Sequence, residues 1–254
     1  MKIDFYIADP TGNITALVDY KPDIDLKTAA HKIMNDDNSI EQVGFISFDD
    51  EKIKLRMSGD EFCGNAAMSS AALWYKLSGK SGEQETEVLF YGVKEPVKTR
   101  VLEKSGYYYC KCAIKRPEEV KNIEFTADKK GYNFPLVCFD GITHIIADNT
   151  ISEQAAIGVI KNLSCRLNAK ALGIMLLNED KTFLKPLVYV SGTDTLFFEN
   201  SCASGSCAVS AAIGAKGEKM SLDQPGGTLE ILNLGDVLLL SGKVKISARY
   251  SKEI

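Results

Sequence analysis

FCGNAAMSSAAL (residues 62–73) and SCASGSCAVSAA (residues 201–212) are the two stretches that decide the fold of this chain. In each of them a cysteine precedes a run of small residues, which predicts a helix that begins just after the cysteine. Aligning the stretches keeps Cys63 and Cys202 in register, about half the chain apart. The alignment indicates that one structural unit occurs twice.

The order of predicted elements around each cysteine helix also repeats. Residues 1–78 give strand, turn, strand, helix, a hairpin of strands and the first cysteine helix, and residues 134–215 give the same series up to the second one. A glycine-bearing link and further strands follow each helix. We therefore predict two pseudo-symmetric domains, residues 1–119 and residues 120–254, with their boundary near the charged stretch RPEEVKN (116–122). The last strand is free to pack with the first domain.

The periodicity of apolar residues predicts an α+β protein. Helical spacing occurs in four segments, at residues 25–35, 64–77, 152–163 and 203–215. Alternating apolar and β-branched residues predict strands at residues 2–8, 41–48, 52–57, 86–92, 106–115, 134–139, 170–176, 183–190, 193–198, 228–233 and 243–249.

Composition and charge restrict the classes of function. The chain has 254 residues, of which 45% are hydrophobic and 25% charged, and a net charge of −4. A mildly acidic chain is a poor nucleic-acid partner, because binding to phosphates requires basic surface. No apolar run approaches the roughly 20 residues of a membrane span, and the N-terminal residues do not resemble a signal peptide. We expect a soluble, cytoplasmic protein without a membrane partner, and glycine motifs typical of nucleotide binding are absent.

The seven cysteines predict free thiols, because nothing in the sequence indicates export. Cys110 and Cys112 are spaced to share one face of a strand, and Cys207 is expected to pack between its helix and a sheet. His31 and His144 stand far apart, so zinc binding has little support, and we predict no metal site. His144 is interpreted as a packed strand residue.

The two cysteine helices together suggest a chemistry. The backbone N–H groups at a helix N-terminus form an anion site, and a cysteine in the same field is expected to have a lowered pKa. A carboxylate held between two such helices would place its α-carbon between the sulfurs of Cys63 and Cys202. One thiolate could then remove the α-proton while the other thiol donates from the opposite face. Either cysteine alone is more simply interpreted as a packing residue, but the paired occurrence favours catalysis.

These residues resemble the diaminopimelate epimerase family of racemases, which work without pyridoxal phosphate. The resemblance lies in five segments that span nearly the whole chain: Thr11-Gly12-Asn13, Glu41-Gln42, Cys63-Gly64-Asn65, Cys202-Ala203-Ser204-Gly205, and MSLDQPGGTLEI at 220–231.

The resemblance implies two domains, each a mostly antiparallel sheet or barrel wrapped around a central helix, with the active site in the cleft. It implies a free amino acid as the small-molecule substrate and no cofactor, with a homodimer as an open possibility. The implied site residues are the catalytic Cys63 and Cys202 and the substrate-binding Asn13, Gln42, Gly64, Asn65, Ala203 and Ser204.

Departures from the family pattern concern the distal end of the substrate. Val190 and Ser191 stand where the family has a Glu-Arg pair whose arginine holds the distal carboxylate. The family's GNPH reads as Gly141-Ile142-Thr143-His144, and its NADGSE loop is shortened to MSGDE. Diaminopimelate would therefore lack its charged partner. The chain looks closer to the histidine racemase-like branch, so we expect an amino acid racemase with histidine as the substrate.

Other interpretations stay open at this point. They are a diaminopimelate epimerase, an isomerase of the phenazine-biosynthesis type, and a non-catalytic binding module or thiol redox protein on the same fold. Glu61 and Glu199, shortly before the two cysteines, are either substrate contacts or solvated loop residues, and we do not count them in the site. If Cys63 and Cys202 face each other, oxidation could join them in a disulfide.

Overall fold

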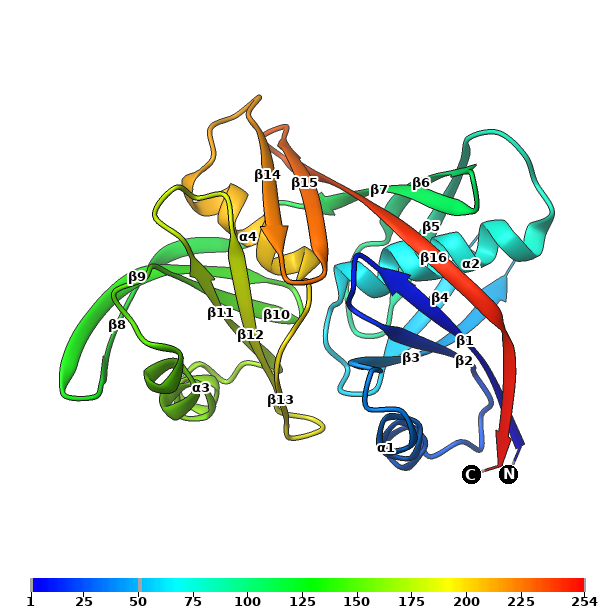
Figure 1. The fold of residues 1–254 in the computed structure, drawn as a ribbon, viewed down its shortest axis with the longest axis horizontal. Helices are drawn as coiled ribbons and strands as arrows, with labels where there is room; N and C mark the ends of the chain where they lie inside the picture. The colour runs from blue at the N-terminus through cyan, green and yellow to red at the C-terminus, as the bar shows by residue number, and fades with distance from the viewer. Residues whose placement is uncertain (1, 50–51, 254) are drawn as a thin grey trace.

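The computed structural model describes residues 2–49 and 52–253 (Figure 1). These residues contain four helices and sixteen strands, and the strands form two sheets. The elements are β1 (Lys2–Pro10), β2 (Thr15–Asp19), α1 (Leu26–Asp36), β3 (Gln42–Asp49), β4 (Lys52–Met57), α2 (Gly64–Ser78), β5 (Gln84–Phe90), β6 (Val97–Lys104), β7 (Tyr107–Lys115), β8 (Glu119–Ala127), β9 (Lys130–Phe139), β10 (Ile142–Ala147), α3 (Glu153–Leu167), β11 (Ala171–Leu177), β12 (Leu184–Val190), β13 (Thr195–Phe198), α4 (Ala203–Ile213), β14 (Lys219–Gln224), β15 (Gly227–Asn233) and β16 (Val237–Glu253).

The larger sheet closes into a barrel around α2. Its order is β1-β2-β3-β4-β5-β6-β7-β16-β15-β14, and β16 also pairs with β1. This second pairing closes the ring of β1 to β7 and β16, and α2 runs through the ring in Figure 1. Such a position requires a helix that is apolar or small on every side.

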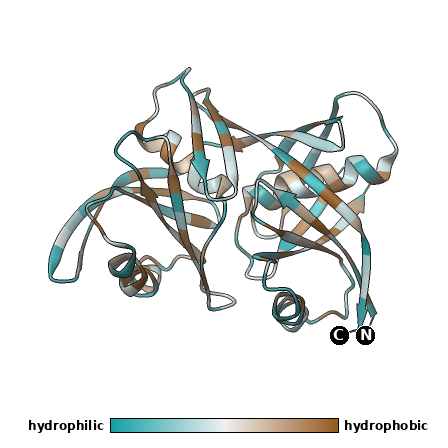
Figure 2. Cartoon of the chain, viewed as in Figure 1, coloured by the Kyte–Doolittle hydropathy of each residue, from teal (hydrophilic) through white to brown (hydrophobic). Residues whose placement is uncertain are grey.

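The sequence of α2 meets that requirement. Every residue from Gly64 to Tyr75 is buried, and most of them are alanine, serine or glycine, which allow the strands to approach closely. Figure 2 shows the helix pale to brown over most of its length. The helix ends where Gly79 adopts the left-handed conformation (φ 64°), a common helix stop.

The second sheet has the order β13-β12-β11-β10-β9-β8. Helix α4 packs against β9, β10 and β15, whereas α3 packs against β8, β11 and β12. Helix α4 is thus enclosed between the second sheet and the β14–β15 hairpin of the first sheet (Figure 1). Its residues from Ala203 to Ser210 are buried, like those of α2.

Strand β16 ties the two parts of the molecule together. Its first half pairs with β15 on one side and β7 on the other, and from Val244 onward it pairs with β1. Figure 1 shows it crossing from the β14–β15 hairpin over the barrel to the N-terminus. The last strand thus pairs with β1 in the first half of the chain, a packing that the sequence left open. The pseudo-symmetric division at residues 119 and 120 stays a prediction.

The α+β class and the four helices match the sequence-based expectations within a few residues. The list of expected strands omitted β2, β6, β8, β10 and β14. Strand β8 lies at the expected domain boundary. It was not predicted because its first four residues are all exposed and show no alternation. The pairs β2–β3, β4–β5 and β10–β11 are parallel within otherwise antiparallel sheets.

No helix in the described part of the chain is long and apolar enough to cross a membrane. The outer helices α1 and α3 are amphipathic instead, and each buries one face: Ala29, Ala30 and Ile33 in α1, and Ala155, Ala156, Ile160, Leu163 and Ser164 in α3.

Candidate active site

Cys63 and Cys202 are the N-cap residues of the two enclosed helices. Both have extended backbones, with φ/ψ of −137°/109° and −127°/106°. The Sγ atom of Cys63 accepts the backbone N–H of Ala66 at 3.3 Å, and that of Cys202 accepts the N–H of Gly205 at 3.4 Å. The sequence pattern of a cysteine before small residues thus produces the same cap twice, since a side-chain acceptor is needed there.

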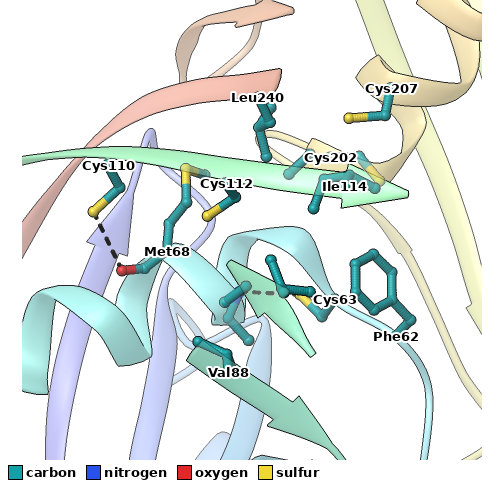
Figure 3. Close-up of a cluster of buried hydrophobic side chains, with 14 of the residues drawn as sticks. Phe62, Cys63, Met68, Val88, Cys110, Cys112, Ile114, Cys202, Cys207 and Leu240 are labelled. Carbon is teal, nitrogen blue, oxygen red and sulfur yellow. Dashed lines mark hydrogen bonds between the residues drawn. The ribbon is translucent and has the colours of Figure 1, made fainter. Parts of the chain in front are cut away.

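The first turns of the two helices touch. A Cβ atom placed on Gly64 would lie 2.8 Å from the Cβ of Ala203, closer than real Cβ contacts. One glycine at this contact is therefore sufficient, which explains why an alanine can stand at the second position. Figure 3 shows Cys63 and Cys202 within one buried cluster that also contains Ile114 and Leu240.

A single cavity adjoins both cysteines. Its wall comes from α1, from the segments around β3 and the start of α2, from the β12–β13 hairpin and from the start of α4. It includes every predicted site residue except Asn13. The lining residues are Ala30, His31, Met34, Glu41, Gln42, Ser58, Glu61, Phe62, Cys63, Gly64, Asn65, Ile142, Val188, Val190, Thr193, Thr195, Phe197, Glu199, Cys202, Ala203 and Ser204.

Gln42 connects Cys63 to a carboxyl group from the other half of the chain. The Cys63 thiol donates to Oε1 of Gln42 at 2.9 Å, and Nε2 of Gln42 donates to Oε1 of Glu199 at 2.8 Å. The three side chains form one hydrogen-bonded chain. In this arrangement the proton of Cys63 points at the amide oxygen of Gln42.

Ser204 is the polar neighbour of Cys202, as Gln42 is of Cys63. Its Oγ lies 3.6 Å from Sγ of Cys202 and 2.9 Å from Nε2 of His144 on β10. His144 is fully buried, as predicted for a packed strand residue, and burial lowers its pKa to about 3. A neutral imidazole thus holds the hydroxyl group next to the second thiol.

The loop before Cys202 is held by side chains from the first half of the chain. Asn13 and Asn65 each donate Nδ2 to the carbonyl of Ser201, at 2.9 Å and 2.8 Å. Asn13 also donates to Glu41, whose carboxylate accepts the backbone N–H of Asn200. Asn13 therefore does not form the cavity wall but positions the segment that carries Cys202.

Gln224 completes the support of the second cysteine. Its Oε1 accepts the backbone N–H of Cys202 at 2.7 Å, and its Nε2 donates to Oγ of Ser206 at 3.0 Å. The residue belongs to β14, in the segment that resembles the late family motif. Its neighbour Gly226 allows a second close approach, because a Cβ there would lie 2.7 Å from the Cα of Gly12.

Three carboxyl groups at the cavity have raised pKa values. Burial raises the pKa of Glu61 to about 7, and burial together with the charge of Glu41 raises that of Glu199 to about 8. Burial also raises the pKa of Glu41 to about 7, against hydrogen bonds from Asn200 that lower it. Glu61 and Glu199, which sequence reasoning left out of the site, are only 8% and 6% exposed.

The expectation of lowered thiol pKa values is wrong for this conformation. Burial, followed by the charge of Glu199, raises the pKa of both Cys63 and Cys202, and the N–H groups of the helix starts offset only part of this. Both thiols are consequently protonated at neutral pH. A thiolate can form only if a nearby base takes the proton or a ligand changes the local charge.

Several buried acceptor atoms lack a partner. Oδ1 of Asn13, Oδ1 of Asn65 and Oε2 of Glu199 form no hydrogen bond with the described residues. Unpartnered acceptors are costly inside a protein, and those of Asn65 and Glu199 belong to residues that line the cavity, where a ligand can supply donors. With two helix N-termini for an anion, the site can hold a zwitterion between two thiols.

No group of three or more His, Cys, Asp or Glu side chains in the described ranges is arranged to hold a metal ion. Sequence reasoning named the two thiols and five further residues of the wall, but it missed Gln224 and the residues of α1 and the β12–β13 hairpin. Gln224 lies within the motif at 220–231, which therefore could have indicated it. The residues of α1 and the β12–β13 hairpin reach the cavity only through tertiary packing, and no local motif marks them.

Comparisons with known proteins identify the family of this chain. The family model described as the histidine racemase CntK N-terminal domain matches residues 2–250. The chain is similar to a histidine racemase of Fusobacterium nucleatum, with 33% identity over 265 residues that cover 97% of this chain and 95% of the relative.

Among solved structures, the fold is similar to that of an epimerase proposed for Pseudomonas aeruginosa, with a TM-score of 0.75, 14% identity and 99% of each chain covered. It is also similar to a phenazine biosynthesis PhzF family protein of Enterococcus faecalis, with a TM-score of 0.61, 13% identity and 100% of each chain covered. At these identities the likeness concerns the fold alone. The phenazine-type fold therefore does not distinguish between the isomerase classes.

Proposed function

This chain belongs to the histidine racemase CntK N-terminal domain family and is an amino acid racemase, and on that premise we propose that it inverts the α-carbon of free histidine by a two-thiol mechanism without a cofactor. The observation that carries the proposal is the pair of N-cap cysteines, Cys63 and Cys202, at the touching starts of two helices beside one cavity. We assign the proton transfers to these two sulfur atoms.

The α-carboxylate and ammonium groups of a substrate suit opposite features of the site. The backbone N–H groups at the two helix starts favour the carboxylate, and they favour it more strongly as it gains enolate charge. The unpartnered oxygens of Asn65 and Glu199 favour the ammonium group. Binding would thus satisfy the orphan acceptors and place the α-carbon between the sulfurs.

Glu199 is the base that we assign to thiol activation. Its charge raises the pKa of both thiols, and its own raised pKa of about 8 makes it a better proton acceptor than a surface carboxylate. Transfer of the Cys202 proton to Glu199 leaves a thiolate and a neutral carboxyl group. The net charge of the site does not change.

Proton transfer to and from carbon then follows. The Cys202 thiolate takes the α-proton, and the electron pair of the broken C–H bond spreads into the substrate carboxylate. The Cys63 thiol donates its proton to the opposite face of the α-carbon, so the product is the other enantiomer. Cys63 ends as the thiolate and Cys202 as the thiol, which is the protonation state required for the reverse reaction.

Three features of the cavity favour histidine over diaminopimelate. Its described lining contains no lysine or arginine that could hold a distal carboxylate. Three carboxyl groups line it, of which those of Glu61 and Glu199 are buried, and such acceptors suit a substrate with a second proton-donating group. Val190 and Phe197 add apolar surface for a ring.

Proton NMR in D2O tests the proposal. The protein is incubated with reductant and without added cofactor, separately with L-histidine and with diaminopimelate. We expect the α-proton signal of histidine to disappear while D-histidine accumulates, as measured by chiral chromatography. Exchange on diaminopimelate but not on histidine would reject the substrate, and no exchange on either would reject the mechanism.

A further inference from the structure

A third carboxyl group at the cavity has no role in the proton transfers described above. Glu61 lies in the loop between β4 and α2 and faces the cavity. Its Oε2 accepts the backbone N–H of Gly59 at 3.0 Å, and the backbone of Glu61 itself also forms a hydrogen bond to the carboxyl group. The side chain is 8% exposed and has no positively charged partner among the described residues, so its carboxylate is costly in this cavity.

The protein itself supplies no cation for this group. None of the ion pairs among the described residues includes Glu61, and the charges that act on it come from acids. Arg56 is the nearest cation along the chain, but it forms an ion pair with Asp60, to which it donates two hydrogen bonds of 2.7 Å and 3.2 Å. A positively charged or further N–H partner for Glu61 can therefore be supplied by a ligand in the cavity.

The other two cavity carboxyl groups are already engaged. Both oxygens of Glu41 accept hydrogen bonds, from Asn13 and Asn200. Glu199 acts electrostatically on both thiols, whereas Glu61 acts on that of Cys63, so Glu199 is the carboxyl group near both reacting sulfurs. Glu61 is the carboxyl group that remains for the rest of the substrate.

Glu61 also lies against the β12–β13 hairpin, which forms part of the cavity wall. A Cβ atom built on Gly59 would lie 2.7 Å from Oε2 of Glu61 and 2.4 Å from Cγ1 of Val190, so the carboxyl group and this valine are neighbours. Val190 ends β12 and begins the hairpin that contributes Thr195 and Phe197 to the wall. An acceptor beside apolar surface suits a flat ring that carries an N–H group.

We propose that Glu61 determines the side-chain specificity of this enzyme by accepting a hydrogen bond from the imidazole N–H of the bound substrate. This inference rests on the proposed function and adds a recognition residue that does not touch the reacting atoms. It predicts that the enzyme prefers amino acids whose side chain carries an N–H donor that can reach Glu61. Amino acids whose side chain ends in a carboxylate should be poor substrates.

Steady-state racemisation by Glu61→Gln tests the assignment, with Glu83→Gln as a matched control on an exposed loop. We expect KM for L-histidine to rise about ten- to a hundredfold, because a hydrogen bond to a charged group is lost, while kcat changes less. Glu83→Gln should match the wild type. Equal KM values for Glu61→Gln and the wild type would overturn the assignment.

Substrates methylated on either imidazole nitrogen provide a test that needs no variant. One of the two methylhistidines lacks the N–H that faces Glu61, so the wild type should turn it over with a KM raised to a similar degree. Glu61→Gln should show no further loss on that substrate. Wild-type activity that is equal on histidine and on both methylhistidines would refute the assignment and leave histidine racemisation intact, whereas no activity on histidine would remove both proposals.

Discussion

The thiol of Cys63 donates its proton to Oε1 of Gln42 across 2.9 Å, and no hydroxyl group shares that contact. Cys202 instead lies beside the hydroxyl group of Ser204, which is held by the neutral His144. The two sulfurs thus have different neighbours although their helix caps are alike. The thiol of Cys63 is arranged as a proton donor. The Ser204 hydroxyl group beside Cys202 can instead donate its proton to a Cys202 thiolate.

Serine substitutions should separate the two proton transfers. Cys63→Ser and Cys202→Ser should each lower racemisation about 10²- to 10⁴-fold, because each removes one acid–base group. The remaining thiol should still exchange the α-proton of a single enantiomer in D2O, and that enantiomer should differ between the variants. Proton NMR with pure L- and D-histidine measures both effects.

Cys207→Ser is the control for these substitutions, since this fully buried residue lies on α4 beyond the helix start. Its thermal melt shows the cost of placing a hydroxyl group in the core. Racemisation near the wild-type rate by either active-site variant would disprove the two-base assignment.

Glu199 should control the acid side of the pH–activity profile. Its pKa is raised to about 8, so below that pH it is protonated and cannot accept a thiol proton. We expect kcat/KM to rise with pH up to about 8. In Glu199→Gln the rate at pH 7 should fall at least about 100-fold and continue to rise above pH 8, because the thiol must then lose its proton to solvent.

Profiles of kcat/KM between pH 6 and 9.5 check this prediction. Titration of the free substrate affects both proteins equally and cancels in their ratio. Superimposable profiles for Glu199→Gln and the wild type would show that Glu199 is not the acceptor.

Parts of this site could be predicted from the sequence because their signals are local. A cysteine before glycine, alanine and serine specifies both an N-cap and a helix that can be enclosed, and both α2 and α4 begin where expected. The burial of Glu199 has no local signal. It depends on a hydrogen bond from Gln42, 157 residues away in the chain.

The strands that escaped prediction have a related cause. Strand β6 reads VKTRVLEK, which alternates only over its first five residues and ends in the exposed Leu102, Glu103 and Lys104, so its place in the sheet becomes evident only when the barrel closes. The wall of the cavity could not be predicted for the same reason, because tertiary packing brings its residues together. Met34 from α1 and Phe197 from β13 meet only after both halves of the chain have folded.

Stability should fall as the pH rises through the range in which Glu61 titrates. The pKa of Glu61 is raised from its ordinary 4.5 to about 7, so the folded state binds the proton more tightly than the unfolded state. The cost is absent below pH 4.5, grows between pH 4.5 and 7, and reaches at most about 3 kcal/mol above that range. Glu61→Gln does not ionise and should lose less stability across it.

Urea unfolding at pH 5 and pH 8 measures the difference between the two proteins. His144 acts in the opposite direction, since its lowered pKa destabilises the fold as the pH drops below 6.5. That contribution is common to both proteins and cancels. An identical change in the free energy of unfolding for the wild type and Glu61→Gln would contradict the raised pKa.

The contact between the two helix starts can be tested by a compensating pair of substitutions. Gly64→Ala would place its Cβ 2.8 Å from that of Ala203, and relief of the overlap should cost about 1–3 kcal/mol of stability. Ala203→Gly removes the opposing methyl group, so the double variant should recover most of the loss, apart from up to about 1 kcal/mol for a glycine in a helix.

A double-mutant cycle from urea unfolding gives the coupling energy. Additive effects would mean that the two starts are not in direct contact. Recovery of stability together with racemase activity would show that their close approach sets the distance between the two thiols.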